Sequence, residues 1–132
     1  MNRFFNCCTA VALTLVAATA MAAPPKQLIT HNRTDVESNA FVAGTIPSQH
    51  PTRAHSDGVV FWTAVKMACF GHTNGDKCSA LIKMASNTAN PVDLGFVEMD
   101  LKTGDITPKQ IVANGYIMTV NGPGETTISK NQ

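Results

Sequence analysis

The sequence has little charge of either sign, few aromatic residues and no long apolar segment. Of its 132 residues 14% are charged, with 10 Lys and Arg against 9 Asp and Glu, so the formal net charge is +1. A nucleic-acid binder normally carries a basic excess, and this composition excludes that class together with electrostatic attachment to an anionic membrane. No stretch approaches the ~20 apolar residues that a membrane-spanning helix needs. We therefore expect no transmembrane anchor.

Residues 1–22 have the features of a secretory signal peptide. Arg3 supplies a basic start, a short apolar run follows, and Ala20-Met21-Ala22 forms a small-x-small cleavage site. Cleavage at this site would leave nine basic residues against nine acidic ones and make Ala23 the first residue of the mature chain. We expect a periplasmic or secreted (extracellular) protein.

Only four cysteines are present, and two of them, Cys7 and Cys8, lie in the predicted signal peptide. They precede its apolar run instead of following it, so we expect no lipid anchor. The remaining pair, Cys69 and Cys78, predicts a structural disulfide because the chain is exported. Their spacing is not Cys-x-x-Cys, and His72 alone cannot complete a tetrahedral zinc site. We expect no metal and no other cofactor.

The densest run of β-branched and aromatic residues, residues 59–85, contains both of these cysteines. If Cys69 and Cys78 face each other across an antiparallel pair, the run forms a β-hairpin whose loop is residues 72–75. Gly75 then takes the positive φ that such a turn requires. An alternative is that residues 78–85 begin a helix, because Ala, Leu, Lys and Met are good helix formers.

In this register the two faces of the hairpin differ in character, because side chains alternate across a strand. The face that carries the cysteines is mostly aliphatic and predicts a core. The opposite face is mixed and includes Trp62, Lys66, Leu81 and Lys83. An aromatic ring beside cations suits surface recognition, which makes these four residues a candidate binding face. The competing interpretation is that Trp62 belongs to a second core layer.

The segment between the signal peptide and the hairpin, residues 23–57, is polar, irregular and rich in proline. It lacks the apolar density needed to offset its ordering entropy, so we expect a flexible leader. Residues 40–43 are the one part that could add an edge strand. The folded unit is then a single β domain of residues 58–132.

The second half of the chain alternates strand and turn patterns. Residues 94–101 alternate apolar and acidic side chains, residues 110–120 are interrupted at Gly115, and residues 125–130 are rich in threonine. Turn residues at 102–105 and 121–124 separate these runs. The pattern predicts an all-β fold, a small antiparallel β-sandwich or open barrel of five to six strands around the disulfide-tied hairpin.

Two stretches carry a resemblance to known proteins: KCSALIKMASNTANPVDLGFVEMDLKTGDITPKQ at residues 77–110 and NGYIMTVNGPGETTISKN at residues 114–131. Together with the export signal, they resemble a group of small exported proteins of unassigned function from Legionella-like bacteria. The resemblance implies a bacterial, exported protein and no catalytic position.

We expect a non-enzymatic binding module whose partner is a protein, a glycan or a component of the cell envelope. The alternative is a small secreted hydrolase with an unrecognised site. His72 is the one histidine within the predicted domain, and it lies at the tip of the hairpin. A catalytic histidine needs a partner and walls that exclude water, so we predict no catalytic residues.

Overall fold

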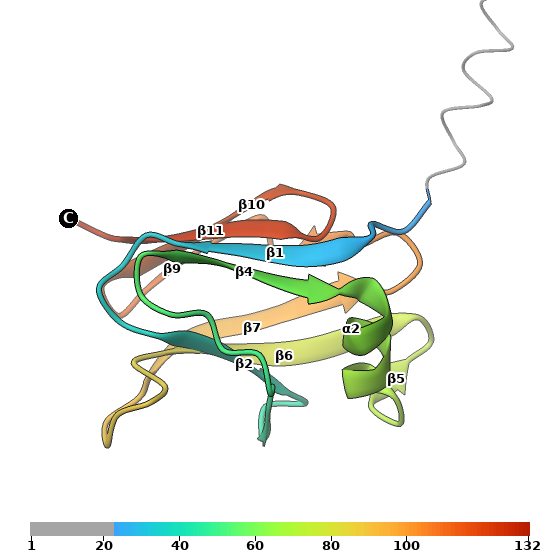
Figure 1. The fold of residues 1–132 in the computed structure, drawn as a ribbon, viewed down its shortest axis with the longest axis horizontal. Coiled ribbons are helices and arrows are strands. Elements are labelled where there is room, and N and C mark those ends of the chain that lie inside the picture. The colour runs from blue at the N-terminus through green and yellow to red at the C-terminus, as the bar shows by residue number, and fades with distance from the viewer. Residues whose placement is uncertain (1–22) are drawn as a thin grey trace, which may run out of the picture.

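The computed structural model describes residues 23–132, and they form two β-sheets packed face to face as an open sandwich (Figure 1). The predicted signal peptide and its cleavage site lie outside the described residues. Most strand pairings are antiparallel, and the sheets do not close into a barrel. The predicted all-β class is therefore confirmed.

The first sheet has five strands in the order β4-β1-β11-β10-β9. Their bounds are β4 (Ser56–Phe61), β1 (Gln27–Asn32), β11 (Glu125–Lys130), β10 (Tyr116–Gly122) and β9 (Gln110–Ala113). Strand β1 runs antiparallel to β4 and parallel to β11. A pairing of the first and last strands joins the two ends of the described chain.

The second sheet has the order β3-β2-β6-β7-β8, and β5 also pairs with β6. Their bounds are β3 (Ile46–Pro47), β2 (Ser38–Val42), β6 (Lys77–Met84), β7 (Val92–Asp100), β8 (Ile106–Thr107) and β5 (Thr73–Asn74). Strand β7 confirms the alternating run at 94–101. In the other sheet, the break at Gly115 between β9 and β10 and the closing strand β11 are also confirmed.

The core lies between the sheets, where alternate residues of facing strands meet. Met84 and Leu94 come from the second sheet, and Met118 and Ile128 come from the first; all four are almost fully buried. This placement follows from the alternation of side chains along each strand, which directs one set of residues inward.

The expectation of a flexible leader at residues 23–57 is wrong. Strand β1 lies inside the first sheet with partners on both sides, and β2 pairs along its length with β6. Buried polar groups in this segment are also satisfied: the Asn32 side chain is 0% exposed, and its amide donates to the carbonyl of Val36 at 2.8 Å. The segment orders by backbone pairing, which does not need high apolar density. It adds strands to the expected five or six, and the domain does not begin at residue 58.

The expectation that residues 59–69 continue as one hairpin strand is also wrong. Strand β4 ends at Phe61, and residues Trp62–Cys69 form the helix α2. Trp62, Val65 and Cys69 lie on one side of this helix and are buried, because they are spaced by three and four residues. The helix lies at one end of the sandwich, between the two sheets (Figure 1).

The second half of the expected hairpin is confirmed. Residues 78–85 do not begin a helix, since β6 spans Lys77–Met84. The hairpin that β6 forms with β5 is much smaller: Thr73 pairs with Cys78, and Asn74 pairs with Lys77. The expected loop at residues 72–75 and the expected cross-strand pairing of Cys69 with Cys78 are therefore wrong, because the turn is residues 75–76 and Cys69 lies in α2. Gly75 in this turn has the expected positive φ of 65°.

Candidate functional site

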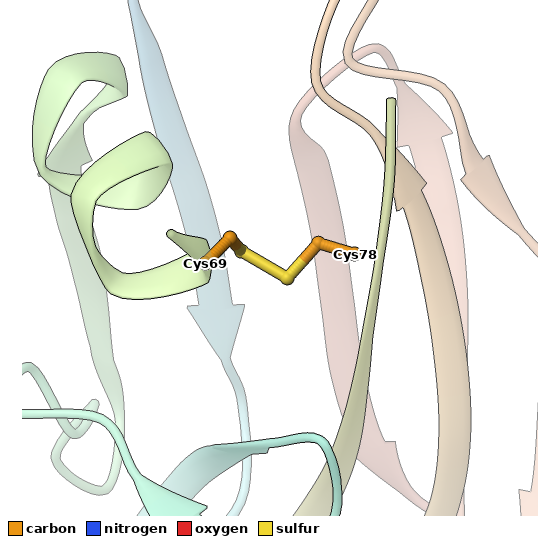
Figure 2. Close-up of a disulfide and its surroundings, with 2 residues drawn as sticks. All are labelled: Cys69 and Cys78. Atoms are coloured by element: carbon orange, nitrogen blue, oxygen red, sulfur yellow. A yellow bond between two sulfur atoms is a disulfide. The ribbon is translucent and has the colours of Figure 1, made fainter. Parts of the chain in front are cut away.

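The predicted disulfide is present and links the helix to the second sheet (Figure 2). Cys69 is the last residue of α2 and Cys78 lies near the start of β6, with their Cα atoms 6.0 Å apart. Both cysteines are 3% exposed and pack with Val42 and Leu101. Because α2 follows β4 directly, the disulfide ties the end of the first sheet's edge strand to the second sheet.

The structure separates the four residues of the predicted binding face. Trp62 is 5% exposed, and its indole N–H donates to the carbonyl oxygen of Leu101 at 3.0 Å. Trp62 is therefore a core residue that fixes α2 against the loop after β7. Lys66 lies on the exposed side of α2.

Leu81 and Lys83 lie on the outer face of β6, away from α2. There Leu81 pairs with Phe41 of β2 on one side and with Phe96 of β7 on the other. The ammonium group of Lys83 lies 5.0 Å from the centroid of the Phe41 ring and 3.5 Å from Asp93 Oδ1. Leu81, which is only 9% exposed, and Lys83 thus share an outer sheet face with two phenylalanines and without Trp62, and a binding role for this face stays a prediction. Sequence reasoning missed Phe41 because it lies in the segment expected to be flexible.

A cavity of about 130 Å³ lies between the sheets. Most of its lining is apolar, and several of the lining residues are small. The small ones are Ala40, Ala64, Ala68 and Ala80. Alanine at facing positions leaves space that longer side chains would fill, so the interior is hollow at this point.

Two neighbouring hollows share lining residues with the cavity, on the side where the sandwich is open. One, of about 80 Å³, extends along β1 and β4, and the other is a groove of about 340 Å³ bordered by Ile46 and Met67. Ser48 and His50 line all three spaces. We call the three together the cleft, and Ser48 and His50 its mouth. None of the lining residues is Asp, Glu, Lys or Arg.

The elements around the cleft explain why it is open on this side. Strand β4 is an edge of the first sheet, and the short strand β3 is an edge of the second. The segment between β3 and β4 crosses from one sheet to the other and contains both mouth residues. Hydrogen bonds hold it in place: the Ser48 N–H donates to Ala40 O at 2.8 Å, and the Asn39 side-chain amide donates to Ser48 O at 3.0 Å.

A cluster of polar residues, separate from the cleft, lies on the first sheet and was not predicted from the sequence. The His31 ring lies between two carboxylates, with Nδ1 2.8 Å from Asp57 Oδ1 and Nε2 2.7 Å from Glu125 Oε2. The hydrogen bond with Asp57, and then the one with Glu125, raises the pKa of His31, and the hydrogen bond with His31 lowers the pKa of Asp57. Arg33 also bonds Asp57 at 3.2 Å.

This cluster ties β4, β1 and β11 together, since each strand contributes one member. Both ring nitrogens of His31 are engaged, which leaves neither free to accept a proton from a substrate. The cluster therefore forms an ionic hydrogen-bond network that links three strands. No pattern of local spacing could have found it, because the three residues come from distant parts of the sequence. Among residues 23–132, no group of three or more His, Cys, Asp or Glu side chains is arranged to hold a metal ion.

Comparison with known proteins identifies the family. A family model described as "T2SS substrate NttC" matches residues 1–131. The chain belongs to the NttC family. A crystal structure titled as the Legionella pneumophila type II secretion system substrate NttC is 60% identical in sequence, with a TM-score of 0.80. The match covers 81% of this chain and 99% of that one. A search of curated proteins found no match.

Membership of the NttC family confirms that this is an exported protein of Legionella type, and it confirms the expected periplasmic or secreted location. The described part of the chain has no helix long and apolar enough to cross a membrane. The NttC fold in this chain thus combines a disulfide-linked sandwich with an apolar cleft at one open edge.

Proposed function

We propose that this NttC-family chain is a secreted, non-enzymatic binding module that takes an apolar group into the cleft between its sheets. The observation that carries the proposal is the apolar cavity of about 130 Å³ that opens at Ser48 and His50. Concave, mostly apolar spaces with a few polar groups are the usual form of small-molecule sites. The exposed side chains of Ile46 and Met67 extend the apolar surface outward from the mouth.

The size of the cavity sets the scale of the binding energy. Empty space in a core costs about 24 cal/mol per Å³, so a group that fills this cavity would gain about 3 kcal/mol. Contacts with the outer groove would add to that value. We therefore expect a dissociation constant of several millimolar for a small probe that fills the cavity alone, given that 1 mM corresponds to about 4 kcal/mol.

The apolar lining of the cavity also restricts which class of partner can bind there. A glycan needs many directed hydrogen bonds, and the inner cavity offers few polar groups for them. A lipid-like component of a cell envelope, or an apolar side chain of a partner protein, matches the lining better. Among the partner classes expected from the sequence, the cleft favours these two.

The test is a titration with benzene, followed by NMR of the methyl groups. Resonances of Val60, Val65 and Ile82, which line the cavity, should shift and saturate, whereas Val112 on β9 should not move. The variant Ala80→Leu fills the cavity and should abolish the shifts. The matched control is Ala89→Leu, because Ala89 is exposed in the loop before β7.

Two outcomes would count against the proposal. Absence of saturable shifts at the cavity methyls would contradict it, and so would equal shifts in wild type and in Ala80→Leu. Should Ala80→Leu fail to unfold cooperatively, Ala64→Leu on α2 fills the same space from the other side. The hydrolase alternative predicts turnover, so an acyl ester incubated with the protein should be recovered intact if the binding proposal is correct.

A further inference from the structure

We infer that the cleft binds a medium-chain monocarboxylic acid, with the alkyl chain inside and the carboxylate at Ser48 and His50. This inference rests on the proposed function and names the chemical class of its ligand. It follows from three properties of the cleft: the lining of its interior, the groups at its mouth and its size.

The inner cavity of about 130 Å³ favours a chain without polar groups. Away from the mouth, the polar side chains that line the inner cavity are Thr30 and Thr126, and the other lining residues are apolar. Placing a hydroxyl or amide there without a hydrogen-bond partner would cost binding energy. An alkyl chain carries no such penalty.

The mouth offers hydrogen-bond donors. The backbone N–H of His50 donates to Ser48 Oγ at 2.9 Å, so that oxygen already accepts a bond and its own proton is free to donate outward. An imidazole N–H of His50 is a second donor. Two donors that line the same mouth suit a carboxylate, which accepts at both oxygens.

The lining of the cleft carries no charged side chain of either sign. No acidic side chain lines the cavity, the adjoining hollow or the groove. No basic side chain lines them either, so the preference for a carboxylate over an ammonium head rests on the two donors, Ser48 and His50.

The volume limits the chain length. An engineered apolar cavity of about 150 Å³ holds benzene, so the cavity of about 130 Å³ takes roughly a six-carbon group. The adjoining hollow of about 80 Å³ is lined in part by the polar residues Ser38, Asn39 and Thr52, so it adds space for the carbons next to the carboxylate. An eight-carbon acid therefore fits the described space, and a much longer chain would extend into the groove beside Met67.

The test compares octanoate, octanol and octylammonium by titration calorimetry, with methyl NMR to locate the bound chain. Octanoate should bind at least tenfold more tightly than octylammonium and should shift the methyls of Val60 and Ile82. His50→Gln should weaken octanoate binding about tenfold and leave octanol binding unchanged. His72→Gln is the matched control, since His72 is exposed and lines none of the three spaces, and it should change neither affinity.

The outcomes separate this inference from the proposed function. If octanol equals octanoate and His50→Gln changes neither, the cleft takes apolar groups without a carboxylate site, and only the inference fails. If none of the three ligands shifts the cavity methyls, both fail. Ser48→Ala gives a second, independent check, and a carboxylate site predicts that it too weakens octanoate selectively.

Discussion

Reducing the disulfide between Cys69 and Cys78 should destabilise the sandwich by an amount that can be worked out from its position. The two cysteines are separated by 9 residues. The chain-entropy relation for a loop of this length gives about 2.6 kcal/mol at 25 °C. Reduction leaves both sulfur atoms in place, so this loss measures the constraint alone.

Replacing both residues with alanine should cost more than reduction. Both cysteines are 3% exposed and pack with Val42 and Leu101. Each lost sulfur is similar in size to a methylene group, worth about 0.8 kcal/mol on burial. The double variant Cys69→Ala/Cys78→Ala should therefore lose about 4 kcal/mol in total.

The assay is urea denaturation followed by far-UV circular dichroism for the sheets and by fluorescence of Trp62 for the helix. The two probes should give coincident transitions in oxidised, reduced and double-variant protein, because Trp62 and Val65 still hold α2 in the core. A change of less than about 0.5 kcal/mol in the free energy of unfolding on reduction, no larger than most surface substitutions produce, would contradict this prediction.

Three further predictions follow from other parts of the fold. Deleting residues 23–57 should abolish cooperative unfolding in denaturant, because β1 lies inside the first sheet; a stable remainder would contradict the topology. Trp62→Phe should lower the free energy of unfolding by about 1 kcal/mol or more, because it removes the hydrogen bond to Leu101; an unchanged urea midpoint would show that this bond contributes nothing. The raised pKa of His31 adds stability that is full below pH 6.5 and is lost as the pH rises through the folded-state pKa, whereas the lowered pKa of Asp57 adds stability that is lost as the pH falls below 3.8. Unfolding measured across pH should show both losses, and His31→Gln should remove the loss at higher pH.

The strands that could be predicted are those that alternate clearly along the chain. In β7 the half-buried Val97 and Met99 alternate with the exposed Phe96 and Glu98, and in β10 and β11 turn residues mark the ends. The disulfide was also predictable, because one pair of cysteines remains after the signal peptide. These features are local, so single-sequence reasoning can find them.

The parts that could not be predicted depend on distant pairing or on competing propensities. Strand β1 has little apolar periodicity, and its order comes from β11 at the other end of the chain. Residues 62–69 are rich enough in aromatic and β-branched residues to suggest a strand. The spacing of Trp62, Val65 and Cys69 is helical, and this spacing predicts α2 correctly. The cleft depends on how the two sheets pack, which alternation within each strand does not specify.

The most direct test of the central claim is a crystal structure of the protein under xenon pressure. Xenon enters apolar cavities without forming specific polar contacts, so it reports on the cavity independently of any head group. We expect a xenon atom between the sheets beside Val60, Ile82 and Met118, and none in Ala80→Leu. Crystals of the wild-type protein that hold no xenon at this position would contradict the claim that the sandwich contains an apolar binding site.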